Sequence, residues 1–123
     1  MLSKNAVVKV RRALEKGYTG TFIVTEHQKV TKPNHTTGFS DVDVLVDQPC
    51  RLSFSSSPSV TDGDVAEVHQ TVKLFFAPEI NVKEGSKITV TQNGVKTEYK
   101  QSGTPAVYST HKEILLELFR GWA

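Results

Sequence analysis

The sequence predicts a mainly β protein, a small antiparallel β-barrel or sandwich with one amphipathic α-helix at its N-terminus. Three observations predict this fold. From Tyr18 onward, the apolar residues fall into short runs with a two-residue period, which is the period of strands. Asn93-Gly94 separates two such runs and best suits a type I′ hairpin turn. Apart from the ambiguous final run 106–119, only one stretch, near the N-terminus, has the apolar spacing of a helix.

Length and composition indicate a single self-supporting domain over residues 1–123. A chain of 123 residues can bury about two thirds of its unfolded surface without a metal or disulfide. The net charge of +2 is too small to indicate a nucleic-acid or membrane surface by itself. Cys50 is the single cysteine, so we predict a buried structural thiol. No signal peptide or membrane span is recognisable, so we expect synthesis in the cytoplasm and no contact with a membrane.

The predicted helix covers residues 4–16. Ser3 or Asn5 can cap its start, and Gly17 can end it. At about 100° per residue, one continuous arc of the helix is apolar: Ala6, Val7, Val10, Ala13 and Leu14. A basic line runs beside this arc: Lys9, Arg12 and Lys16. The basic line is either the solvated flank of a packed helix or an edge that meets phosphate or an acidic partner.

The barrel is predicted to occupy residues 18–120. Residues 19–24 indicate a strand that 28–32 extends or pairs with, before a polar loop at 33–38. Two further strands are predicted at 40–46 and 50–54, with Pro49 interrupting the pairing between them because proline has no amide hydrogen. The side chains expected to face the core alternate along these two strands: Val42, Val44, Val46, Cys50, Leu52 and Phe54.

The next segment is predicted to be a long mobile loop, because it is too polar to bury enough apolar surface. It consists of Ser55, Ser56, Ser57, Pro58, Ser59, Val60, Thr61, Asp62, Gly63 and Asp64. In a small compact domain, a loop of this length is either functional or a plain flexible connection.

The remaining chain reads as strands. Residues 65–76 should form a strand with Val72, Leu74 and Phe76 inward, and a short strand is expected at 80–82. The hairpin at 87–100 pairs outward from Asn93-Gly94, so the expected partners are Gln92 with Val95, Val90 with Thr97, Ile88 with Tyr99, Thr89 with Glu98, and Lys87 with Lys100. The segment 106–119 allows either a helix or a strand, and we predict a strand from its β context.

No motif in the sequence indicates catalysis, a cofactor or a metal. The histidines are far apart, and none has a second ligand at zinc-site spacing. Nucleophile elbows, glycine-rich phosphate loops and HExxH sequences do not occur. Phe75, Phe76 and Tyr99 fit a core better than a base-stacking platform. We therefore predict a non-enzymatic protein without cofactors, whose strand edges and apolar terminus, including Phe119 and Trp122, can be covered by neighbouring subunits.

Several segments, in this order, resemble the neck proteins of tailed phages and PBSX-like prophages, which are head-closure or head-tail connector subunits. The resemblance rests on Gln48–Ser53, Lys73–Pro78, Ile80, Val82, Gly85, Ser86, Ile88, Val90, Tyr99, Ser102, Gly103, Pro105, Val107, Tyr108, His111 and Glu113, with Leu118, Phe119 and Trp122 at the end. It extends over most of the chain.

This resemblance implies a structural virion protein of the neck, between capsid and tail. Copies of the chain would form a ring, with portal or adaptor proteins on the head side and tail terminator or tail tube proteins on the tail side. Genomic DNA would pass through without sequence-specific contact, and a loop from each subunit would help close the channel. By length and composition, 55–64 is the candidate for that loop. The helix residues Lys9, Arg12 and Lys16 and the terminal Phe119 and Trp122 are candidates for subunit or partner contacts. The alternatives are another neck component, such as a tail terminator, or a small nucleic-acid-binding β-barrel.

Overall fold

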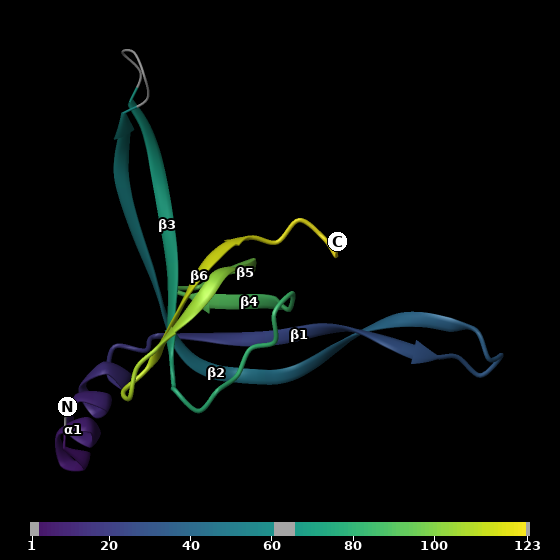
Figure 1. Ribbon diagram of the computed structural model, residues 1–123, viewed down its shortest axis with the longest axis horizontal. Coiled ribbons are helices and arrows are strands. Elements are labelled where there is room, and N and C mark those ends of the chain that lie inside the picture. Colours follow the sequence, from purple (N-terminus) through teal and green to yellow (C-terminus); the bar gives the residue numbers. More distant parts are fainter. Residues whose placement is uncertain (1–2, 61–65, 123) are drawn as a thin grey trace.

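The computed structural model describes residues 3–60 and 66–122 and shows a closed antiparallel barrel with projecting elements (Figure 1). Helix α1 spans Lys4–Glu15. The strands are β1 (Gly20–Thr31), β2 (Thr37–Val60), β3 (Ala66–Phe76), β4 (Lys87–Gln92), β5 (Val95–Val107) and β6 (Lys112–Leu118). Their order around the barrel is β1-β2-β3-β6-β5-β4, with β4 closing on β1. The predicted fold class is confirmed, and the chain forms the barrel rather than the sandwich.

The barrel interior is a single apolar cluster to which all six strands contribute. Its members are Phe22, Val24, Cys50, Leu52, Leu74, Phe76, Ile88, Val90, Tyr99, Ile114 and Leu116. The rings of Phe22 and Phe76 lie 5.3 Å apart between centroids, tilted by 57°. Cys50 is fully buried as predicted, and this burial raises the pKa of its thiol to about 12. Cys50 is therefore a packing residue in the folded protein.

The β4/β5 hairpin has the predicted turn and the predicted register. Asn93 and Gly94 both have positive φ, 54° and 76°, as a type I′ turn requires. All five predicted pairs occur, from Gln92 with Val95 to Lys87 with Lys100. The final run is also a strand, β6, which pairs with both β3 and β5. Side chains of β4 and β5 that face inward complete the core, and on the outer face Lys87 bonds Glu98 at 3.0 Å.

Strand β2 is continuous through Pro49, so the predicted interruption is wrong. Pro49 lies opposite Thr21 of β1, and pairing with β3 begins only at the next residue, Cys50. At Pro49 the strand therefore has one neighbour instead of two. A proline is tolerated in a strand at such a position, where a ladder bond on one side is not required.

The predicted core face of β2 is wrong at three positions. Val44 and Val46 are 39% and 50% exposed, while Leu45 packs against the core. Shifts in the β1/β2 register on either side of Val24 place extra residues in β2, and an extra residue reverses which side chains point inward. Phe54 is exposed as well, because it lies where the barrel gives way to a two-stranded arm.

Two hairpins extend beyond the barrel as two-stranded arms (Figure 1). Strand β1 pairs with β4 only over Thr21–Thr25, and from residue 26 onward it pairs with β2 alone. We call residues 26–42 the β1/β2 arm. Strand β3 pairs with β6 only from Val72 onward, so residues 55–60 and 66–71 form a second ribbon, the β2/β3 arm. The two arms point in different directions.

The segment predicted as a loop at 55–64 is a strand over its first six residues. Ser55–Val60 belong to β2 and pair in register with Ala66–Thr71 of β3. A serine-rich strand can form here because the ladder requires only backbone groups, which β3 supplies opposite every residue. Thr61, Asp62, Gly63 and Asp64 lie outside the described residues.

The short strand predicted at 80–82 is absent from the described chain, which runs from Phe76 to Lys87 without a strand. Ile80 and Val82 nevertheless pack against the core. Strand β4 already has β1 on one side and β5 on the other, so the closed barrel offers this segment no free edge. The segment instead covers the barrel with its two apolar side chains.

One polar side chain connects β4 to β2 where no strand lies between them. Gln92 accepts a hydrogen bond from the backbone N–H of Leu52 at 2.8 Å and donates one to the Leu52 carbonyl at 3.0 Å. The β1/β2 ladder ends at Gly20 and Cys50, before it reaches Leu52. The Gln92 amide therefore replaces a missing strand and satisfies both backbone groups of a buried residue.

Candidate functional site

The features that stand out as functional candidates are the elements that project from the barrel: α1, the two arms and the C-terminal tail, residues 119–122. The helix forms as predicted. The Ser3 hydroxyl accepts a hydrogen bond from the Ala6 N–H at 3.2 Å, and Lys16 is the C-cap. None of the residues of α1 is buried, so this helix contributes nothing to the barrel core. A helix of 12 residues is marginally stable in water without tertiary packing.

An ion pair and the last helical turn hold α1 to the barrel. The Arg11 guanidinium bonds Glu15 at 2.8 Å and also bonds Glu79 in the segment after β3. Glu79 is the main cause of a raised Arg11 pKa, and in return Arg11 lowers the pKa of Glu79. These groups are largely solvated, so the pair orients the helix more than it stabilises the fold.

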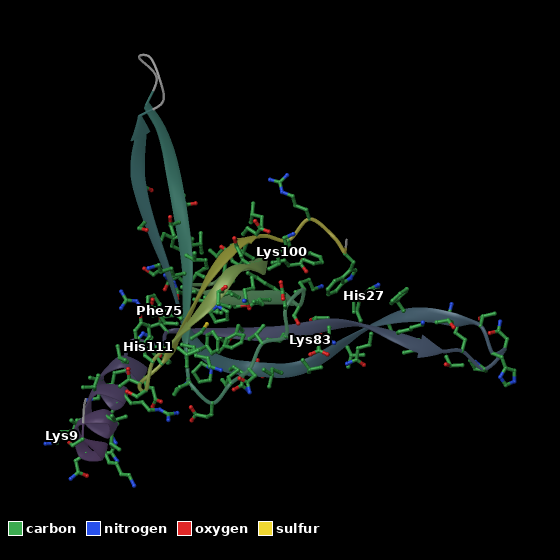
Figure 2. The ribbon with its side chains drawn as sticks, viewed as in Figure 1. Lys9, His27, Phe75, Lys83, Lys100 and His111 are labelled. Carbon is green, nitrogen blue, oxygen red and sulfur yellow. The ribbon has the colours of Figure 1, made fainter. Side chains whose placement is uncertain are left out.

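The basic line of α1 lies in solvent. Lys9, Arg12 and Lys16 are all exposed, and Figure 2 shows Lys9 on the free part of the helix. Beside the basic line, the apolar arc is only partly covered, since Val10 is 41% exposed. The helix therefore presents uncovered apolar and basic side chains together, as an interaction face would.

A cavity of about 320 Å³ lies where α1 joins the outer face of the barrel. Leu14 and Tyr18 form its helix side, and Phe75, His111 and Glu113 are among the residues of its barrel side. His111 stacks on Tyr108 at 4.8 Å and bonds Glu113 at 2.9 Å through Nε2. Figure 2 shows Phe75 and His111 close to the base of the helix. Side chains from β3, β6 and the end of α1 therefore line one cavity at this end of the barrel.

The two terminal aromatic residues that the sequence singled out, Phe119 and Trp122, lie together and pack against residues of the same chain. Phe119 N–H donates to the Glu98 carbonyl at 3.1 Å, which extends the tail beside β5. The ring of Phe119 meets Trp122 edge-on at 4.9 Å. Both side chains remain partly exposed. A role in subunit contacts stays a prediction for these two residues.

His27 is the residue that holds this tail, and the sequence analysis did not identify it. Its ring lies between Trp122, at 4.8 Å, and Phe39, at 4.6 Å, nearly parallel to both. Its Nδ1 is 2.8 Å from Asp41 Oδ1. The His27 hydrogen bond is the main reason why the pKa of Asp41 is lowered, and the nearby Trp122 lowers it further. The His27–Asp41 pairing across β1 and β2 follows from register, which no local sequence signal shows.

A second cavity, of about 290 Å³, separates this tail from the loop before β4. Its lining includes Glu26, Lys83, Lys100, Phe119 and Trp122. Figure 2 shows Lys83, Lys100 and His27 around this region. The charged groups have mixed signs, and Lys100 already bonds Glu117 at 3.2 Å. This cavity is a depression between a tail and a loop rather than a site selective for one charge.

The described residues contain no cluster of three or more His, Cys, Asp or Glu side chains arranged to hold a metal ion. Among the same residues, no helix is long and apolar enough to cross a membrane.

Comparison with known proteins gives one structural likeness. The sequence matches no family model and no curated protein. Among solved structures, the phage-like element PBSX protein xkdH of Bacillus subtilis is similar, with a TM-score of 0.46 and 10% sequence identity. The matched region covers 80% of this chain and 90% of the xkdH chain.

Proposed function

We propose that this protein is a structural subunit of a phage neck, where copies form a ring that joins the DNA-filled head to the tail. The observation that carries the proposal is the set of projecting elements around a small barrel. The barrel itself has a complete core and a closed ladder. The helix and both arms lie outside it. Val10 on the helix, Phe39 on the β1/β2 arm and Phe54 at the base of the β2/β3 arm are 41%, 62% and 52% exposed.

The projecting elements need further contacts. Two-stranded ribbons and short helices are marginally stable alone in water. A chain that extends three of them from one compact barrel suits an assembly in which neighbouring molecules cover them. The resemblance of the sequence to phage neck proteins supports this kind of assembly.

Within the ring, we propose that the β2/β3 arm faces the DNA channel. It extends far beyond the barrel, and its described side chains next to the barrel, Ser55 and Ser56, are polar and exposed. Uncharged polar side chains do not bind phosphate as lysine and arginine do, so they suit a lining along which DNA slides.

Deletion of the gene in its phage tests the neck role. Electron microscopy should show DNA-filled heads and finished tails that remain unjoined, and a plasmid copy of the gene should restore joined particles. Normally joined, infectious particles without the gene would refute the proposal. Tails of uncontrolled length would instead indicate a tail terminator.

A symmetric truncation tests the arm. Ser55 and Thr71 lie opposite each other as a hydrogen-bonded pair, because Leu52 turns its backbone groups to Gln92 and alternate residues of a strand bond opposite neighbours. Replacing residues 56–70 with Asn-Gly should therefore create the same two-residue turn as in the β4/β5 hairpin. We expect the truncated protein to fold and to enter particles that lose DNA or infectivity. The control replaces residues 33–35 of the other arm with Asn-Gly, between Lys32 and Thr36, whose backbones bond at 2.8 Å. Full infectivity and retained DNA in the first variant would exclude the channel role.

A further inference from the structure

The surface of β2 opposite its core side carries a stripe that complements α1 in charge and in apolar content. We define the β2 stripe as Asp43, Val44, Val46 and Asp47. Both valines are exposed, at 39% and 50%, and both aspartates are exposed. No lysine or arginine occurs between Phe39 and Cys50, and the β1 residues opposite the stripe, Phe22–Thr25, are uncharged. The stripe is therefore apolar and acidic.

We call the matching surface on the helix the α1 face. Its apolar part is Ala6, Val10 and Ala13, and its charged part is the adjacent basic line, Lys9, Arg12 and Lys16. On the helix the apolar arc and the basic line are neighbours, at about 100° per residue. Val7 and Leu14, at the other border of the arc, are half-buried, whereas Val10 and Ala13 are exposed. The alanines allow a strand to approach the helix closely.

The charged groups at both surfaces are available for contacts. Arg11 is occupied by Glu15 and Glu79 and points to the barrel, whereas Lys9 and Arg12 lie on the exposed side. On the stripe, Asp43 accepts a hydrogen bond from the neutral Thr25 hydroxyl at 2.7 Å, and no cationic side chain of the described residues forms a salt bridge with it. Asp47 has a φ of 51°, where the strand is distorted, and its side chain is in solvent.

We propose that α1 of one copy packs on the β2 stripe of a second copy of this chain. Within one molecule, the Arg11–Glu79 bond holds α1 beside the segment after β3, and the helix does not pack extensively on β2. The contact joins two different surfaces, so its head-to-tail repetition generates a ring or an open filament, whereas two reciprocal contacts would stop at a dimer. This inference rests on the proposed ring and names the contact that builds it. Packing on the stripe also gives the short helix the tertiary support that its own barrel does not supply.

A charge exchange tests the contact on the full chain. The first variant carries Lys9→Glu and Arg12→Glu, and the second carries Asp43→Lys and Asp47→Lys. Each variant alone opposes like charges, so we expect its self-association to weaken by about tenfold or more. An equimolar mixture should regain association, because each interface then pairs opposite charges. Sedimentation velocity at low and high salt measures all states, and high salt should reduce the differences.

A cysteine pair tests the geometry. Under mild oxidation at millimolar protein concentration, the Val10→Cys/Val46→Cys variant should form a ladder of cross-linked oligomers. Each single-cysteine variant is the matched control and should stop at dimers. The native Cys50 is fully buried and should not take part.

The outcomes separate this contact from the neck function. A ladder together with recovery in the charge mixture supports the contact. A double-cysteine variant that cross-links no further than its controls, or a Lys9→Glu/Arg12→Glu protein that associates like the unaltered chain, overturns it. Neither result bears on the gene deletion, whose readout is whether heads and tails join. If the Lys9→Glu/Arg12→Glu protein still formed a ring, a different interface would build that ring, and the proposed neck role would be unaffected.

Discussion

Replacing Gln92 with methionine should destabilise the barrel severely, although the substitution conserves length and adds apolar surface. The Gln92 amide makes two hydrogen bonds to the backbone of Leu52, at 2.8 and 3.0 Å. Leu52 is 8% exposed. A thioether replaces neither bond, so one N–H and one carbonyl lose their partners inside the barrel.

Leu52 and Gln92 line a cavity of about 180 Å³, so water can replace part of the lost hydrogen bonding. The Gln92 side chain is closely packed toward Gly20, where an added Cβ would lie 3.2 Å from the Gln92 Cβ. Each buried backbone group that loses its partner costs about 1–3 kcal/mol. We therefore expect Gln92→Met to lower the free energy of unfolding by roughly 2–4 kcal/mol, after a small gain from the apolar side chain.

Urea denaturation followed by circular dichroism measures the effect. With a slope of about 2 kcal/mol per molar urea, which is typical of a small domain, the midpoint should fall by roughly 1–2 M with the slope unchanged. The control is Gln48→Met, which removes an exposed hydrogen bond to the Val46 carbonyl and should cost less than about 0.5 kcal/mol. If Gln92→Met were as mild as this control, the amide would not be replacing a strand.

Three further predictions concern the arm, the tail and the core. The bond to His27 lowers the pKa of Asp41, so this bond stabilises the folded protein fully at any pH above the ordinary carboxyl pKa. The stabilisation is lost as the pH falls through the lowered pKa of Asp41. Asp41→Asn should therefore reduce the melting temperature at neutral pH and match the unaltered protein in acid; a difference independent of pH would contradict this. His27→Ala should shift the fluorescence of the only tryptophan, Trp122, to longer wavelengths as the ring gains water contact, whereas an unchanged spectrum would exclude the stack as its main support. Cys50, with a pKa of about 12 and no exposed surface, should react with a thiol reagent only at the rate of unfolding, and rapid labelling of folded protein would show that the barrel opens.

Predictions from the sequence succeeded where the deciding interactions are local. The α1 bounds follow from the Ser3 cap and the helical apolar period. The β4/β5 register follows from Asn93-Gly94, because a two-residue turn leaves only one way to pair the strands. The basic line was correctly placed on this helix, and its exposure agrees with one of the two interpretations, the solvated flank, without excluding the other.

The errors occur where a neighbour distant in sequence decides the structure. Val44 and Val46 alternate like core residues, and only the bulged pairing with β1 turns them outward. Ser55–Val60 are polar enough for a loop, and only the presence of β3 opposite them makes a strand. The apparent strand at Ile80 has no partner because β4 is already paired on both edges.

The candidate surfaces show the same division between local and long-range control. The residues themselves identify a basic amphipathic helix, an aromatic terminus and a β scaffold, since these depend on periods of two and about 3.6 residues. Strand order and register decide three other properties: the helix face that stays uncovered, the position at which Trp122 packs, and the completion of the barrel wall by Gln92. Register is set by hydrogen-bonded pairs between distant segments, so these properties became visible only once the barrel was closed.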